Sequence, residues 1–518
     1  MTVTIKELIV VLAIAATIFR FAQPIALRYS THNDFSRRRN VWFVLTITAF
    51  LSPNFWLFAL VALPVLAWAG RKDANPVALY LLMLLVVPDI PMDIPAPGIN
   101  RLFPLDIYRL LSICVLIPTS WRLWRARNPV RGHGLTVMDV LLLAYGALQV
   151  VLFIPPDLHN HVILEDSATN VLRRAFLFFV DVYVLYYVVS RFCSDRRTIA
   201  EAMAAFCLSC AVAASVAFFE FLRHWLLYVD IAVRWSHNPS AGFYLGRGEA
   251  LRAQASAGHP LALGYLLAIA FGLWLYIQSQ IKSTRTRFAV SIIYWLGLLA
   301  AYSRGPWIGA IVIYFAFVTV GPRPLSRLVR AVGIVGLIGG VVALSPLGQR
   351  IINVLPFMGG TIDSGSALYR EQLARTSWEV IQQHPFFGDQ LAVFKMRNMR
   401  QGEGIVDVVN TYAQVALNFG LVGLFLFVSF MLVGLFKAYR VVRQMILPDP
   451  DLALVGAGLV ACALGALLMM SSISFILGVE KLFYVLAGLA AAYARLKRST
   501  APDAPNPHYR IRAYGEQR

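Results

Sequence analysis

Apolar runs of about 20 residues, the length that crosses a bilayer as a helix, follow one another along most of the chain. Only 14% of its 518 residues are charged, against about 25% in soluble domains. The apolar material must therefore face lipid or other membrane helices. This pattern excludes a soluble fold and predicts an all-α polytopic integral membrane protein.

The spacing of the runs gives the expected spans. Those near 77–91, 105–121, 135–153, 172–191, 199–222, 258–278, 287–302, 305–321, 328–345, 411–436, 452–475 and 480–495 make about twelve. The stretch 41–69 is long for one helix, and a break at Ser52-Pro53-Asn54 gives a hairpin and about fourteen crossings. The run 8–18 lacks a small-residue cleavage site, so we expect an anchor or interfacial helix there.

Basic residues gather in clusters between these runs. The chain has 46 Lys and Arg against 27 Asp and Glu, a net charge of +19. The clusters lie near 122–131, 191–197, 282–287, 323–330, 437–443 and 495–498. Two crossings fit between neighbouring clusters, so the positive-inside rule places all of them in the cytoplasm. The excess charge therefore follows from topology and does not indicate nucleic-acid binding.

The longest segment left outside is 347–408, which carries six basic and six acidic residues and is therefore charge-balanced. Residues 366–384 in this loop predict an amphipathic helix on the membrane surface, with an apolar stripe of Leu373, Ala374, Trp378 and Ile381. The expected divisions are N-terminal membrane helices 1–170, central membrane helices 171–346, the loop 347–408, C-terminal membrane helices 409–496 and a cytoplasmic tail 497–518.

Arg304 is the one charged residue in the segment 288–320. A single helix of that length would reach about 50 Å, beyond a hydrocarbon core of about 30 Å. The chain must therefore fold back at Ser303-Arg304-Gly305-Pro306, at the outer membrane boundary. An arginine there either snorkels or pairs with a neighbouring helix, or binds an anion at the level of the lipid headgroups.

Arg370 also lies in the outer loop, and its helical neighbours three and four residues away are not acidic. Arg375 differs, because Glu371 and Glu379 flank it at the spacing of surface ion pairs. Arg370 is therefore the better candidate for binding an outside anion.

Arg252 precedes a helix start at Gly258-His259-Pro260, on the expected outer side. Proline in the first turn marks a helix start, where exposed N–H groups favour anions. His259 at this position either caps the helix or contacts a ligand.

Two pairs of carboxylates could bind a divalent metal. Asp89 and Asp93 flank an outer proline-rich loop, and Asp449-Pro450-Asp451 lies in a cytoplasmic turn. Aspartates next to proline are common in ordinary turns, however. We therefore expect no metal site and no cofactor.

Four motifs occur in order within residues 170–440: Arg252 to Pro260, Ser303 to Gly309, Tyr369-Arg370 to Gly388, and Asn410-Thr411-Tyr412 followed by Gly420. Each lies at an outside boundary expected from the charge pattern. Together they resemble the superfamily of O-antigen ligases and of O-antigen and exopolysaccharide polymerases.

Members of that superfamily are metal-independent, inverting glycosyltransferases of the GT-C type, in the bacterial inner membrane. They transfer glycans from a polyprenyl diphosphate to a sugar hydroxyl on the periplasmic face. The resemblance implies that Arg304 and Arg370, with Arg252, hold the diphosphate, since guanidinium groups can stabilise its developing charge. It also implies a lipid-linked donor and acceptor, with a flippase and a chain-length regulator as partners. The substrate-binding residues it implies are His259, Ser303, His384, Asn410 and Tyr412.

The chain departs from the family at Val409, where members often have a histidine before the Asn-x-Tyr stretch. Asp407 or His384 could accept the proton instead, and we favour Asp407. The missing histidine favours a polysaccharide polymerase over a ligase that delivers glycan to lipid A core or protein. A lipid-linked oligosaccharide flippase is the alternative of another class, but it would need polar groups at the bilayer midplane.

Overall fold

The computed structural model describes residues 2–97, 101–126, 135–159, 170–236, 246–247, 250–322, 364–396, 399, 406, 408–476 and 478–496, with a few residues between 324 and 340. The longer helices are α1 (Thr2–Ala26), α2 (His32–Leu51), α3 (Phe55–Lys72), α7 (Val137–His159), α11 (Arg196–Arg223), α13 (Pro260–Ile277), α14 (Thr284–Ala300), α15 (Arg304–Val320), α18 (Ser364–Gln383), α20 (Thr411–Met445), α21 (Pro450–Met469) and α22 (Gly478–Leu496). The shorter ones are α4 (Pro76–Met83), α5 (Ile107–Leu111), α6 (Ile117–Arg125), α9 (Asn170–Phe178), α10 (Val184–Phe192), α12 (Val229–Ser236) and α19 (Ala392–Lys395).

Single turns and two-residue strands complete the described structure. Two π-helical segments, η1 (Ser112–Leu116) and η3 (Phe179–Tyr183), join helices end to end, and the 3₁₀ turns are η5 (Ala255–Ala257), η6 (Gln278–Gln280) and η9 (Met470–Ser472). The strands form two antiparallel pairs, β1 (Met92–Asp93) with β2 (Pro104–Leu105) and β3 (Gly246–Arg247) with β4 (Ala250–Leu251). The chain is therefore all-α in character, as expected.

Eight helical segments in the described part of the chain are long and apolar enough to cross a bilayer: Thr4–Ala26, Phe55–Lys72, Val137–Ile154, Val171–Phe192, Arg196–Arg223, Pro260–Gln280, Thr411–Met445 and Pro450–Ser472. The apolar helix α15 is shorter. The protein is a polytopic membrane protein, in agreement with the sequence. Most of the expected span 328–345 falls outside the described residues, and so does the whole tail 497–518.

The expected break at Ser52-Pro53-Asn54 is present. Helix α2 ends at Leu51, and Asn54 caps α3 by accepting a hydrogen bond from the backbone N–H of Leu57 at 3.0 Å. An asparagine at this position satisfies an N–H group that has no partner within the helix. The two helices therefore form the hairpin that the sequence indicated.

The expected span at 77–91 is wrong in its second half. Only Pro76–Met83 is helical, and all eight residues of this helix are buried. Turns follow, and then Pro88 and Pro91, which lack the N–H that a continuing helix needs. A helix of that length reaches about 12 Å, so α4 ends inside the bundle.

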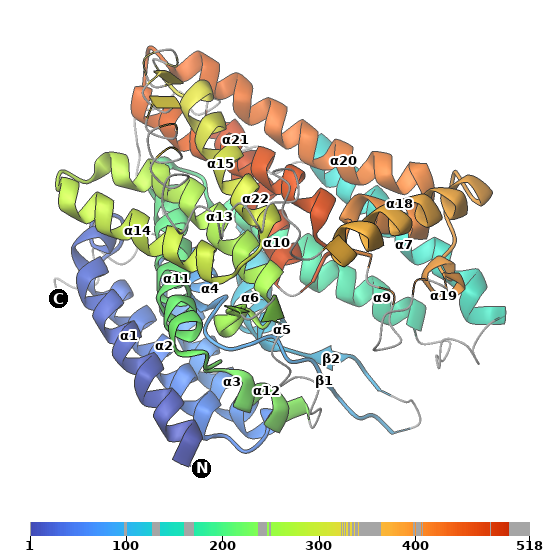
Figure 1. The fold of residues 1–518 in the computed structure, drawn as a ribbon, viewed down its shortest axis with the longest axis horizontal. Coiled ribbons are helices and arrows are strands. Elements are labelled where there is room, and N and C mark those ends of the chain that lie inside the picture. Colours follow the sequence, from blue (N-terminus) through green and yellow to red (C-terminus); the bar gives the residue numbers. More distant parts are fainter. Residues whose placement is uncertain are drawn as a thin grey trace.

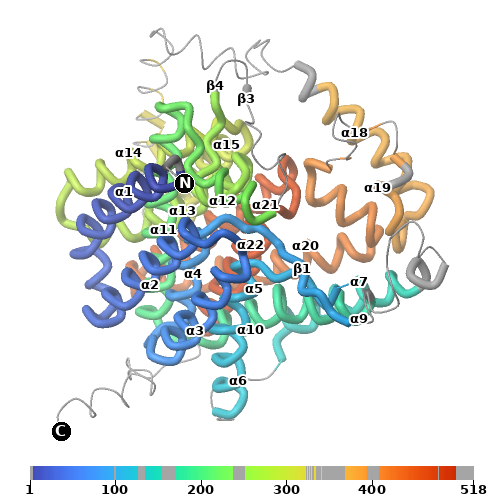
Figure 2. The backbone as a smooth tube through the Cα atoms, turned by 90° about the horizontal axis from the view of Figure 1, so that it is seen from below, coloured from blue at the N-terminus to red at the C-terminus, as the bar shows by residue number. Residues whose placement is uncertain are grey.

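Helix α13 occupies the centre of the bundle. Within its apolar window, 94% of the residues are buried, against 22% for α1. Figures 1 and 2 show α1 and α2 along one side, and α18, α19 and α20 along the opposite side, with α22 between them. The elements that carry the candidate motifs therefore lie in the centre and on the side away from the N-terminal helices.

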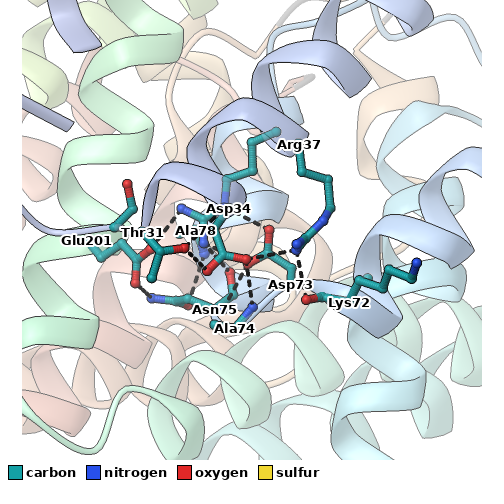
Figure 3. Close-up of polar contacts among 12 residues, drawn as sticks. Thr31, Asp34, Arg37, Lys72, Asp73, Ala74, Asn75, Ala78 and Glu201 are labelled. Carbon is teal, nitrogen blue, oxygen red and sulfur yellow. Dashed lines mark hydrogen bonds and ion pairs between the residues drawn. The ribbon is translucent and has the colours of Figure 1, made fainter. Parts of the chain in front are cut away.

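A buried ion-pair network joins α2, α3 and α11 (Figure 3). The guanidinium of Arg38 lies 2.6 Å from a carboxylate oxygen of Asp73 and 2.9 Å from one of Glu201. The carboxamide of Asn75 donates to Glu201 at 3.0 Å. Such charges are tolerated inside a bundle because they neutralise each other. The network therefore joins the α2–α3 hairpin to α11, which lies far from it in the sequence.

A second network lies beside the π-helical segments. Arg109 contacts Asp106 at 2.6 Å and Asp181 at 2.8 Å, and Lys481 lies 3.3 Å from the other oxygen of Asp181. Asp181 belongs to η3, where the wider helical turn changes the direction in which its side chain points. The start of α22 is thus tied to α5 and η3.

Candidate functional site

Arg304 begins α15, at the fold-back that the sequence predicts. Helix α14 ends at Ala300, and Tyr302 turns the chain with a φ of +47°. Ser303 is the buried N-cap residue, although its hydroxyl makes no capping bond. The indole N–H of Trp307 donates to the carbonyl of Leu298 at 2.7 Å and closes the turn. The half-buried Arg304 side chain therefore leaves from the N-terminus of a helix, where N–H groups favour anions.

The N-terminus of α13 lies against this turn. A Cβ atom on Gly264 would come within 2.7 Å of the Pro306 ring, so the first turns of α13 and α15 touch. His259 is the N-cap of α13, and its Nδ1 accepts the backbone N–H of Leu261 at 3.1 Å. Burial, and then the nearby Arg252 charge, lower the pKa of His259 to about 4. The imidazole is therefore neutral near pH 7, and it acts as a cap.

Glu220, which the sequence analysis did not single out, holds the turn that follows Arg252. One of its carboxylate oxygens accepts the N–H groups of Gln254 and Ala255 at 3.0 and 2.8 Å, and the other accepts that of Leu227 at 3.0 Å. The N–H of Ala253 donates to the carbonyl of Ala300 at the end of α14. The Arg252 segment and the Arg304 turn are therefore adjacent. The sequence feature that could have pointed to Glu220 is its position as a single carboxylate at the end of an apolar helix.

The N-terminus of α20 lies at the same end of the bundle, where it contacts the C-terminal part of α21 and the residues that follow it. Asn410 caps α20 by accepting the N–H groups of Tyr412 and Ala413 at 3.0 and 3.1 Å. The hydroxyl of Thr411 donates to the carbonyl of Ile473 at 2.6 Å, and that of Tyr412 donates to the carbonyl of Leu467 at 2.5 Å. Asn410 and Tyr412 were predicted to bind substrate, and in this structure both make structural hydrogen bonds.

The C-terminal end of α21 also touches α15. A Cβ atom on Gly305 would lie 2.6 Å from the Ser472 hydroxyl oxygen, and one on Gly309 would lie 2.4 Å from the Met469 sulfur. These close contacts place the N-termini of α13, α15 and α20 around one end of α21. Three helix N-termini therefore meet where the sequence predicted a diphosphate site.

Helix α18 packs on α20, but with a different face from the one predicted. Leu373 and Ile381 are buried in a cluster with Ala416 and Leu417 of α20, and Ser377 between them is also buried. The expected stripe members Ala374 and Trp378 are exposed instead. Figure 1 shows α18 lying beside α20.

Arg370 is exposed near the N-terminus of α20. Its neighbour Tyr369 belongs to the apolar cluster that also contains Val408 and Ala413, on either side of the Asn410 cap. Arg375 forms the expected surface ion pair with Glu371, at 2.8 Å. The proposed base Asp407 lies outside the described residues.

The segment 385–389, which we call the clamp, inserts its backbone into a kink of α20. Gly420 interrupts the helix with φ +64° and ψ −167°. The N–H groups of Leu421 and Val422, freed by the kink, donate to the carbonyls of Pro385 and Phe386 at 2.8 and 3.2 Å. The N–H of Asp389 donates to the carbonyl of Leu417 at 2.7 Å.

Glycine is required on both sides of this contact. A Cβ atom on Gly420 would lie 2.2 Å from the Phe386 carbonyl oxygen, and one on Gly388 would lie 2.4 Å from the Leu417 carbonyl oxygen. Gly388 also has a positive φ, +69°, which favours glycine. His384, predicted to contact substrate, is exposed just before the clamp, and its carbonyl accepts the Gly388 N–H at 3.0 Å. The motif from His384 to Gly388 therefore has a clear structural role.

One member of each carboxylate pair considered as a metal ligand has another partner. Asp93 lies 3.0 Å from the exposed Arg101, and Asp449 caps α21 at the N–H of Leu452. Within the described ranges, no group of three His, Cys, Asp or Glu side chains could hold a metal ion.

A comparison with protein families identifies the C-terminal part of this site. Residues 289–428 match the family model described as O-Antigen ligase. They form an O-antigen ligase domain. This domain contains the Arg304 turn, Arg370, the clamp, Asn410 and Gly420, whereas Arg252, His259 and Glu220 precede it. No curated protein matches the chain.

The match covers residues 289–428, and the description of the matched family indicates enzymes that transfer glycans. Lipid-linked glycans are the substrates that the O-antigen ligase domain implies.

Proposed function

We propose that the protein polymerises polyprenyl-diphosphate-linked oligosaccharide repeat units into exopolysaccharide or O-antigen, on the periplasmic face of the bacterial inner membrane. The observation that carries this proposal is the meeting of three helix N-termini beside Arg304, two of which, those of α15 and α20, lie within the matched residues 289–428. Helix N-termini and guanidinium groups both favour the oxygens of a diphosphate. Val409 in place of the family's histidine favours the polymerase over the ligase.

In the proposed reaction, the acceptor hydroxyl attacks the anomeric carbon of the donor and inverts it. The bond to the diphosphate breaks, and the diphosphate takes the electron pair. Arg304 and Arg370, with Arg252, would stabilise the charge that develops on it, so no metal ion is needed. The expected topology places these arginines at the outer side of the membrane. This position suits a substrate whose lipid stays in the membrane and a glycan product that lies outside it.

The proposed roles of Arg304 and Arg370 are tested by replacing each with Ala. We expect each variant to lose about 10²–10³-fold in polymer formation, the effect of removing one donor from a developing anion. Lys should restore activity poorly, because it lacks the planar fork of Arg. Arg375→Ala is the matched control, since Arg375 is on the same helix and pairs with Glu371 at the surface. Wild-type activity in both Ala variants would remove these arginines from the mechanism.

Asp407 is the proposed proton acceptor, on the sequence evidence alone. Asp407→Asn keeps the size of the side chain and removes its basicity, so we expect a loss of about 10²–10⁴-fold in turnover. Donor binding should be unchanged, which equilibrium binding of the lipid-linked unit measures. A variant with full turnover would leave His384 or unassisted attack as the alternatives.

The flippase alternative is separated by an assay in detergent. A transporter moves its substrate between two compartments and forms no bond, whereas a polymerase makes a longer glycan without any membrane barrier. The buried charges of Arg38 and Arg109 do not favour transport, because each contacts carboxylates within 3 Å. We therefore expect purified protein in detergent to lengthen the lipid-linked repeat unit.

A further inference from the structure

The turn that follows Arg252 also lines a cavity of about 230 Å³. Its other walls come from residues 88–91, from the chain before α12 and from α12 itself. The polar side chains on these walls are Asp89, Glu220, Tyr228, Ser236 and Gln254. The cavity therefore adjoins the candidate diphosphate site, because the turn that follows Arg252 belongs to both.

Contacts of this turn fix its position between the two sites. The Ala253 N–H donates to the Ala300 carbonyl, four residues before Arg304. The Ser256 hydroxyl donates to the Leu85 carbonyl at 2.6 Å, close in sequence to Asp89. Ala255 and Gly258 belong to the cavity wall. A molecule in the cavity thus lies next to the backbone that supports Arg304.

The described residues that line the cavity include no cation, whereas the candidate diphosphate site is built around arginines. The charged lining residues of the cavity, among those described, are two carboxylates, Asp89 and Glu220. Glu220 already accepts three backbone N–H groups, which occupy both of its oxygens. The buried Oδ1 atom of Asp89 has no hydrogen-bond partner among the described residues. A diphosphate would find no cation among the described lining residues, whereas the hydroxyl groups of a neutral polyol need none and can bond to a carboxyl group on the wall.

The protonation of Asp89 suits a hydroxyl-rich ligand. Burial, and then the neighbouring Asp106 carboxylate, raise the pKa of Asp89 to about 8, while Lys481 and Arg109 oppose this shift and Asp181 adds to it. The other carboxylate on the cavity wall is Glu220. Near neutral pH the Asp89 carboxyl can therefore donate one hydrogen bond and accept others, as sugar hydroxyls require.

We propose that this cavity is the subsite for the acceptor sugar, and that Asp89 is the group that binds its hydroxyls. The proposal rests on the glycan-transfer function proposed above and names the place of the second substrate. The volume is below the roughly 300–1,000 Å³ of sites for drug-sized ligands, so the cavity suits a single sugar unit. Diphosphate and acceptor sugar would then occupy opposite sides of the turn after Arg252, and Asp89 orients the acceptor without itself reacting.

The test uses an acceptor substrate that cannot act as a glycan donor. In a repeat-unit analogue with a methylene group in place of the anomeric oxygen, the bond to the diphosphate cannot break, so the analogue only receives glycan. Purified protein in detergent is given a fixed concentration of a lipid-linked unit whose acceptor hydroxyl is replaced by hydrogen, so that it only donates glycan, and the analogue at increasing concentration. Mass spectrometry of elongated analogue then gives the KM for the acceptor.

We expect Asp89→Ala to raise the acceptor KM by about 10-fold or more, the effect of losing one buried hydrogen bond of about 1.4 kcal/mol. The donor KM, measured at saturating analogue, should stay within twofold of wild type. Asp93→Ala is the matched control, because Asp93 is exposed in the same loop and pairs with Arg101.

A second variant tests the cavity without relying on Asp89. Ala232 lines the cavity from α12, and Ala232→Phe fills it, so this variant should also raise the acceptor KM selectively. Size-exclusion profiles and thermal unfolding identify any variant that does not fold. Unchanged acceptor KM in either variant that folds overturns the subsite. Wild-type protein that forms no glycosidic bond with the natural unit overturns the polymerase function itself, which is a different result.

Discussion

Gly420→Ala should detach the clamp from α20. The backbone at Gly420 lies in a region of φ and ψ that is essentially restricted to glycine, and another residue there costs about 1–3 kcal/mol. The added Cβ atom would also meet the Phe386 carbonyl oxygen at 2.2 Å, so the clamp must move away. This movement breaks the hydrogen bonds of Leu421 and Val422 to the clamp, each contributing about 0.5–1.5 kcal/mol.

Together these effects predict that local opening of the clamp becomes about 2–6 kcal/mol easier. Hydrogen–deuterium exchange measured by mass spectrometry on peptides containing 417–422 reports this opening directly. An opening free energy lowered by about 2 kcal/mol raises the exchange rates of the Leu421 and Val422 amides about 30-fold. We also expect faster exchange in α18, because the clamp directly follows that helix.

Gly333→Ala is the matched control, since no atom lies within 4 Å of the Cβ position at Gly333. It should leave the exchange of 417–422 at the wild-type rate. Equal exchange in Gly420→Ala and wild-type protein would refute the clamp, because neither the strain nor the lost hydrogen bonds would then exist.

Three further predictions follow from the fold and the expected topology. Arg38→Met should destabilise the protein by about 3–5 kcal/mol, because Asp73 and Glu201 would be left buried without a cation; Arg39→Met is the control, and equal unfolding transitions of the two variants would contradict the network. Gly402→Cys should react with a membrane-impermeant thiol reagent in intact spheroplasts if the loop 347–408 is periplasmic, and labelling only after lysis would reverse the topology. Purified enzyme should make polymer in excess EDTA, and a strict need for magnesium or manganese would contradict charge stabilisation by arginines alone.

Features that depend on consecutive residues were predicted correctly from the sequence. The hairpin at Ser52-Pro53-Asn54 and the fold-back at Arg304 both follow from the length of an apolar run compared with the thickness of a bilayer. The Arg375–Glu371 ion pair follows from helical spacing. These properties are local, so one sequence contains all the information they need.

The buried face of α18 could not be predicted from helical spacing alone. Helical periodicity limits the apolar residues to an arc of the helix, but the arc that includes Trp378 and the arc that includes Ser377 overlap. Packing against α20 decided between them, and it buried Ser377 and left Trp378 exposed. Likewise, an apolar run at 77–91 could not reveal that α4 stops inside the bundle at Met83.

The sequence by itself determined a membrane protein and the place of a candidate site at the Arg304 turn. Only the tertiary structure decided which distant residues support that site. Glu220 holds the N–H groups of Gln254 and Ala255, and Gly388 meets the kink at Gly420. The stability of these contacts depends on how closely separate helices approach, because a buried carboxylate or a bare glycine is favourable only beside its partner. The residue types are visible in the sequence, whereas their partners are set by the packing of the whole bundle.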